Sequence, residues 1–163
     1  MSRAAGLLAL LGASAALLGC GGDSATPQTG DSAVLQFCVD ETNRYRAMDG
    51  KGPIARSTTL EAFAAEGAAQ DTASMQAHHH FGQQDSQHII AFAENACPSW
   101  SGWTLGDGPT ATHDAVAECI KAFYDEGAGG GHYENLMSDN AGVGCGFYIE
   151  NGGITIIQDF GPP

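Results

Sequence analysis

The stretch from residue 131 to residue 149 constrains the fold more than any other part of the chain. It places His132 between glycines and an aromatic residue, and a strand-like segment follows almost at once. Glycines allow positive φ angles and close backbone approach, so the first part predicts a turn that delivers one imidazole to a defined place. From Val143 to Ile149, apolar residues alternate with small residues and a tyrosine, which predicts a strand with one apolar face.

The rest of the pattern predicts an α+β domain. Apolar residues at helical spacing predict helices over about residues 32–48, 58–77 and 110–126, the first with Ser32 as its N-cap. A short apolar strand over 89–93 leads to Glu94, and residues 83–88 read as a polar loop. Two apolar runs flank the turn at 150–153, which predicts a closing hairpin. Three helices with a small antiparallel sheet make the fold α+β.

The N-terminus has the pattern of an exported protein. Residues 1–19 carry one positive charge and then an apolar run too short to span a bilayer, which predicts a signal peptide. The sequence Leu17-Leu18-Gly19-Cys20 resembles a bacterial lipobox, which predicts a lipoprotein lipidated at Cys20. An ordinary secretory peptide cleaved near residues 13–16 is the alternative. Residues 20–32 are rich in Gly, Ser, Thr and Pro and predict a flexible tether, followed by one domain over 33–163.

Charge and cysteine content narrow the function classes. Six basic against nineteen acidic residues give a net charge of −13, which argues against nucleic acid and against electrostatic attachment to anionic lipids. We therefore expect contact with the membrane through the N-terminal lipid alone. With Cys20 lipidated, an even number of cysteines in an exported chain predicts two disulfides with three possible connectivities. The cysteines concerned are Cys38, Cys97, Cys119 and Cys145.

Two glutamates lie where buried residues are expected. Glu94 follows the apolar run, and Glu126 closes a helix, so each needs a partner to offset desolvation. The available partners are His132 and the three histidines at 78–80. Two imidazoles and two carboxylates that converge would form a neutral shell for a divalent metal such as zinc.

These motifs resemble the CAP superfamily, which contains cysteine-rich secretory proteins, insect venom antigens and plant pathogenesis-related proteins. Residues 131–137 are similar to its Gly-His-Tyr-Thr-Gln-Val-Val motif, and 143–146 follow at the usual distance. Glu94-Asn95 resembles the Gly-Glu-Asn motif, and 123–126 resembles Trp-x-x-Glu with phenylalanine for tryptophan. The resemblance covers about residues 34–161. It implies a three-layer α-β-α sandwich with a central cleft that carries two histidines and two glutamates.

The resemblance assigns Glu94, Glu126 and His132 to this cleft and leaves the first histidine open. The plant and animal spacing selects His80, whereas a bacterial Ala-His-x-x-Phe-Gly pattern selects His78, which we prefer slightly. Our preferred disulfide hypothesis pairs Cys38 with Cys145 and Cys97 with Cys119.

The function expected on this basis is that of an exported, lipid-anchored and monomeric binding or interaction module in the bacterial cell envelope. As in some relatives, its partner would be a lipid or a small apolar ligand. The alternative is a metal-dependent protease or esterase in which a glutamate acts as general base on a metal-bound water. No Gly-x-Ser-x-Gly nucleophile elbow is present in the sequence.

Overall fold

The computed structural model describes residues 31–163. The predicted signal peptide, Cys20 and most of the predicted tether lie outside the described residues. The elements are α1 (Ser32–Met48), β1 (Ala55–Arg56), α2 (Thr58–Ser74), α3 (His79–Gln84), β2 (Ala93–Cys97), the 3-10 turn η1 (Ser99–Ser101), α4 (Ala111–Asp125), α5 (Gly131–Met137), β3 (Gly142–Glu150) and β4 (Gly153–Gly161). Within this described part, no helix has the length and apolar character needed to cross a bilayer.

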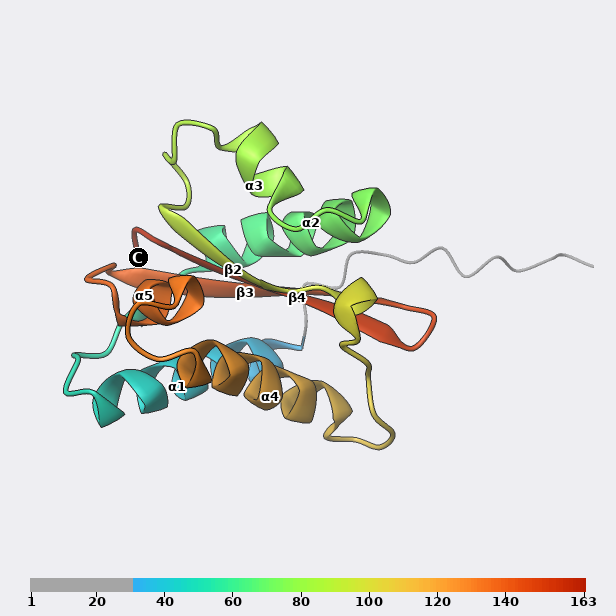
Figure 1. The fold of residues 1–163 in the computed structure, drawn as a ribbon, viewed down its shortest axis with the longest axis horizontal. Coiled ribbons are helices and arrows are strands. Elements are labelled where there is room, and N and C mark those ends of the chain that lie inside the picture. The colour runs from blue at the N-terminus through green and yellow to red at the C-terminus, as the bar shows by residue number, and fades with distance from the viewer. Residues whose placement is uncertain (1–30) are drawn as a thin grey trace, which may run out of the picture.

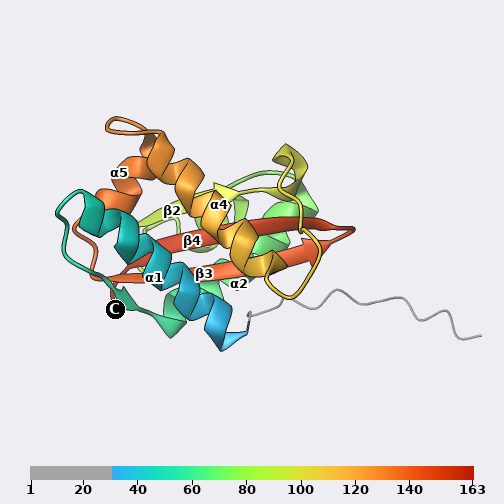
Figure 2. The ribbon, with the colours of Figure 1, turned by 90° about the horizontal axis from the view of Figure 1, so that it is seen from below.

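The fold is a three-layer α-β-α arrangement around a four-stranded sheet. In Figure 1, α2 and α3 lie above the sheet and α1 and α4 lie below it, with α5 at the level of the sheet at one end. Figure 2 shows the lower layer in front, with α1 and α4 crossing β3 and β4. The strand order is β1-β3-β4-β2. The expected α+β class is therefore confirmed.

The sheet is mixed, which corrects the expected purely antiparallel sheet. β1 pairs with β3 in parallel, while β3 with β4 and β2 with β4 are antiparallel. β1 has only two residues, too few for a period-2 pattern to reveal it in the sequence. It is defined instead by a long-range backbone bond from the Ala55 N–H to the Ala141 carbonyl (2.9 Å).

The glycines of β3 explain how closely the upper layer packs on the sheet. A Cβ atom at Gly146 would overlap the backbone of Ala64 and Ala65 in α2, so α2 rests directly on the strand backbone. The opposite face of β3 carries Val143 and Phe147, both buried in the main core with α1 and α4. The alternation expected for this strand is confirmed.

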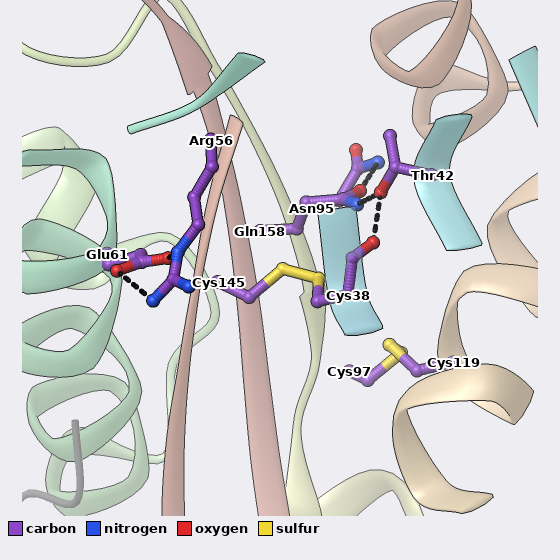
Figure 3. Close-up of a disulfide and its surroundings, with 9 residues drawn as sticks. All are labelled: Cys38, Thr42, Arg56, Glu61, Asn95, Cys97, Cys119, Cys145 and Gln158. Carbon is purple, nitrogen blue, oxygen red and sulfur yellow. Dashed lines mark hydrogen bonds and ion pairs between the residues drawn. A yellow bond between two sulfur atoms is a disulfide. The ribbon is translucent and has the colours of Figure 1, made fainter. Parts of the chain in front are cut away.

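Two disulfides join the lower helices to the sheet. Cys38–Cys145 links α1 to β3, and Cys97–Cys119 links β2 to α4 (Figure 3). These are the pairs preferred in the sequence analysis. All four cysteines are buried.

The expected strand over 89–93 was wrong. β2 begins only at Ala93, and the side chains of Ile89 and Phe92 are 68% and 53% exposed. The Asp85 carboxylate accepts hydrogen bonds from the backbone N–H groups of residues 89–91, at 2.7–2.8 Å. Because those donors are used by a side chain, the apolar run forms a loop instead of joining the sheet.

The ends of two elements also differ from expectation. Asp31, not Ser32, caps α1, since its Oδ1 accepts the Ala33 N–H at 3.1 Å. Helix α2 ends at Ser74, and Met75 follows it with a left-handed φ of 53°. The segment 79–84, part of which was expected as polar loop, forms the short helix α3.

Candidate functional site

The first histidine–glutamate pair lies where α3 meets β2. His78 Nδ1 is 2.7 Å from Glu94 Oε1; the glutamate side chain is 1% exposed and the imidazole 44% exposed. Asp71, near the end of α2, orients the imidazole by accepting the backbone N–H of His78 (2.7 Å) and of His80 (2.9 Å). His78 itself has a left-handed φ of 62°.

The ionisation of this first pair follows from burial and from the hydrogen bond. Burial raises the pKa of Glu94, although the hydrogen bond from His78 opposes the change. The hydrogen bond to Glu94 raises the pKa of His78, against the effect of partial burial. The imidazole is therefore held with its Nδ1 proton directed at the carboxylate.

The second pair lies at the junction of α4 and α5. His132 Nδ1 is 2.6 Å from Glu126 Oε1, and the His132 backbone N–H donates to Glu126 Oε2 at 3.0 Å. Gly130 is required here, because a Cβ atom at that position would crowd the Glu126 side chain. His132 is the second residue of helix α5, so the turn expected from its flanking glycines was wrong.

The environment of the second pair also differs from expectation. The side chains of His132 and Glu126 are 34% and 36% exposed, so Glu126 is not the buried carboxylate predicted from sequence. The hydrogen bond from His132 lowers the pKa of Glu126. This glutamate is thus kept ionised.

Asn95 and Asn135 tie the second pair to the strand that carries the first through three partly buried hydrogen bonds. Asn95 Nδ2 donates to the His132 carbonyl at 3.1 Å. Asn135 of α5 donates to the Asn95 side-chain oxygen at 2.9 Å and to the Glu94 carbonyl at 3.3 Å. Adjacent residues of a strand face opposite sides of the sheet, so Glu94 points toward α2 while Asn95 points toward α5. The two pairs are therefore attached to neighbouring residues of β2, Glu94 and Asn95.

A hydrogen-bonded relay continues from Asn95 through the core to α1. Asn95 Nδ2 also donates to Gln158 Oε1 at 3.2 Å, and Gln158 Nε2 donates to Thr42 Oγ1 at 2.7 Å. Thr42 donates in turn to the Cys38 carbonyl at 2.8 Å (Figure 3). Asn95, Gln158 and Thr42 are fully buried. The relay fixes the orientation of Asn95, and with it the position of α5.

His80, the other candidate for the first histidine, lies in a different environment. Its side chain is 1% exposed and packs against Phe63, with the ring centroids 4.4 Å apart and the rings tilted by 48°. Its Nε2 is 3.6 Å from Glu66 Oε2, and it is His78 that bonds Glu94. Among residues 31–163, no three His, Cys, Asp or Glu side chains are grouped so as to hold a metal. The shared metal shell of His78 or His80 with Glu94, Glu126 and His132 stays a prediction.

Asp159 is a residue of this region that sequence reasoning missed. It pairs in register with Glu94 across β2 and β4 and is fully buried. Burial and the neighbouring Glu94 raise the pKa of Asp159 well above its usual range. An acid within an otherwise buried strand was the signal that could have found it.

A small cavity opens beside the second pair. It has a volume of about 270 Å³, and its apolar walls include Trp103, Phe123 and the buried Cys97. Glu126, His132 and Ser101 contribute polar groups to it. A cavity of this kind can take a small apolar group and place one polar atom against the imidazole.

Comparison with known proteins identifies one family. Residues 39–160 match the sequence profile of the family described as the cysteine-rich secretory protein family, CAP. Among solved structures, a cysteine-rich secretory protein from Staphylococcus aureus is 20% identical with a TM-score of 0.44. That match covers 78% of this chain but only 38% of the other, so the chain spans less than half of that protein's length. No curated protein matches the chain.

Proposed function

The chain belongs to the CAP family of cysteine-rich secretory proteins, and from this premise we propose that its domain is an exported binding module that holds a divalent metal through His78 and His132. One observation carries the proposal. In both histidines Nδ1 is bonded to a glutamate, and no protein group among residues 31–163 bonds either Nε2.

The chemistry of metal-binding histidines supports this assignment. A histidine that ligates a metal through one ring nitrogen usually donates its other N–H to a carboxylate, which fixes the tautomer and makes the ligand more basic. Glu94 and Glu126 would therefore orient the two imidazoles instead of ligating directly, a change from the four-ligand shell expected from sequence. Imidazole nitrogens suit zinc, and the net charge of −13 favours attraction of cations.

The ligand class and location follow from other features. The cavity of about 270 Å³ beside His132 is near the lower end of ligand sites and supports a small apolar ligand more than a long lipid chain. Two disulfides are typical of an oxidising compartment outside the cytoplasm. The lipobox sequence at Cys20 supports a lipoprotein that reaches the membrane through its anchor.

We favour a binding module over the alternative of a metal-dependent hydrolase. That enzyme would need a glutamate free to act as general base on a metal-bound water. Both glutamates are engaged by imidazole Nδ1 atoms at 2.6–2.7 Å.

The test is calorimetric titration of the metal-free full chain with Zn²⁺. We expect His78→Ala and His132→Ala each to weaken binding at least tenfold, and Glu94→Gln to weaken it about 10–100-fold through lost orientation. His79→Ala is the matched control, because it removes a neighbouring imidazole outside both pairs and should leave the affinity unchanged.

Two results would show the proposal to be wrong. One is a wild-type chain that binds none of Zn²⁺, Cu²⁺, Ni²⁺ and Mn²⁺. The other is Zn²⁺ affinity that persists when His78 and His132 are both replaced.

A further inference from the structure

A second concave site lies at the hairpin end of the sheet. It is a groove of about 420 Å³ between the β3–β4 turn, the end of α2 and the segment that starts with η1. None of its lining residues belongs to the two histidine–glutamate pairs. It is therefore distinct from the site of the proposed function.

Trp100 forms the aromatic wall of this groove. Trp103, three residues later, packs against the main core. Trp100 belongs to none of the buried clusters formed by residues 31–163, and it is only partly covered. A tryptophan that contributes to no core and faces a groove offers a flat apolar surface with one N–H donor to a ligand.

Unpaired polar side chains lie along the same groove. Glu150 and Asn151 project from the hairpin turn, and Thr104 lines the wall formed by the segment after η1. In the described part of the chain, none of these three side chains makes a hydrogen bond or an ion pair. No Lys, Arg or His lines the groove, so the Glu150 carboxylate disfavours phosphate, carboxylate or other anionic ligands.

The walls of the groove are held in place by their own hydrogen bonds. The Thr155 hydroxyl of β4 accepts the Ser99 N–H at 3.1 Å and the Thr72 hydroxyl at 2.7 Å, which joins η1 and α2 to the sheet. The Leu105 N–H donates to the Gly152 carbonyl at 2.9 Å and fixes the following segment against the hairpin turn. A preformed groove needs little ordering when a ligand binds.

We propose that this groove binds a neutral saccharide, with one face of a sugar ring stacked on Trp100 and its hydroxyls bonded to Glu150 and Asn151. A pyranose ring combines an apolar C–H face with hydroxyls around its rim, and the groove offers the complementary set. A quaternary ammonium ligand is recognised by several aromatic rings together, and this groove provides one.

The test is an NMR titration of the full chain with β-1,4-linked tetramers of N-acetylglucosamine and of glucose. The sequence has two tryptophans, so two indole N–H signals report on binding, and Trp103 acts as an internal reference. We expect at least one tetramer to shift the Trp100 signal in a saturable way while the Trp103 signal stays in place.

Substitutions sharpen the test. Trp100→Ala should weaken saccharide binding about tenfold or more. Trp100→Phe keeps an aromatic ring and should therefore bind more tightly than Trp100→Ala but less tightly than the unchanged chain. Asn151→Gly removes the amide at a position with a φ of 50°, where glycine keeps the turn, and should weaken binding several-fold. Met48→Ala, at a residue 61% exposed on α1, is the matched surface control.

Three outcomes would overturn the proposal. The first is that neither tetramer moves the Trp100 signal up to its solubility limit. The second is that binding persists unchanged in a folded Trp100→Ala variant. The third is that choline, and not the saccharides, moves the Trp100 signal, which would make the groove a cation site.

Discussion

Replacing Cys38 and Cys145 together by alanine should lower the free energy of unfolding more than replacing Cys97 and Cys119. The first bridge closes a loop of 107 residues and the second a loop of 22. Chain entropy gives about 4.8 and about 3.4 kcal/mol for the two loops. Each double variant keeps the other bridge, so the two variants differ in stability by the difference between these two figures. The expected difference is therefore about 1.4 kcal/mol.

The comparison is well matched, because both double substitutions remove two sulfur atoms from sites that are at most 1% exposed. The loss of packing should be similar in each, and the difference should report on loop closure. The assay is urea unfolding of both double variants, followed by circular dichroism. If the Cys97/Cys119 variant is the less stable of the two, loop entropy is not the dominant effect and local contacts between β2 and α4 are.

The two pairs of cysteine substitutions should affect Zn²⁺ affinity in the opposite order, with the larger loss in the Cys97/Cys119 variant. Cys97–Cys119 joins the strand that carries Glu94 to the helix that ends next to Glu126. Its removal should loosen the proposed metal site, whereas removal of Cys38–Cys145 acts at a greater distance. Equal Zn²⁺ affinities in the two variants would show that this bridge does not position the site.

Three further predictions concern stability, each measured by urea unfolding. Gly146→Ala should lower the free energy of unfolding by about 1–3 kcal/mol or more, because the new Cβ meets the backbone of α2. Gly52→Ala is the control and should change the free energy of unfolding little, because Gly52 has open space around it. Equal losses in the two variants would contradict the packing argument. Gln158→Leu should cost about 1–3 kcal/mol by leaving two buried hydrogen-bond partners unpaired; an unchanged midpoint would refute this. The hydrogen bond from His132 lowers the pKa of Glu126 below its ordinary 4.5, so the ionised Glu126 stabilises the fold above pH 4.5 and this stabilisation is lost as the pH falls through the folded-state pKa. Glu126→Gln should therefore make the fall in stability on the acid side shallower. An unchanged slope of stability against pH would contradict this prediction.

Sequence periodicity was sufficient for the elements that bury one continuous face. Helices α1, α2 and α4 and the closing hairpin were predicted to within a few residues, because each has an apolar stripe long enough to set a period. The short helices α3 and α5 have six and seven residues. Their first turns are held by carboxylates from elsewhere, Asp71 for α3 and Glu126 for α5. Such tertiary contacts leave no period in the sequence.

The geometry of the candidate site also depends on tertiary contacts that the sequence does not reveal. The sequence indicated both glutamates and His132, but for the first histidine it left His78 and His80 open, with only a slight preference for His78. That choice depends on the left-handed backbone at His78, which turns its imidazole toward the strand and sends His80 into the core. Neither the contact of Asp71 with the start of α3 nor the register between Glu94 and Asp159 could be predicted before the tertiary structure was known.

The arrangement of α5 beside β2 has a consequence for self-association. β2 is the outer strand on one side of the sheet, and the amide of Asn135 occupies its backbone acceptor at Glu94. On the other side, the outermost strand β1 is only two residues long. Exposed, regular strand edges are templates onto which further chains can add, and here α5 occupies one acceptor on the β2 edge while the strand at the other edge has only two residues. Both features reduce the length of regular edge onto which the strand of another copy could add.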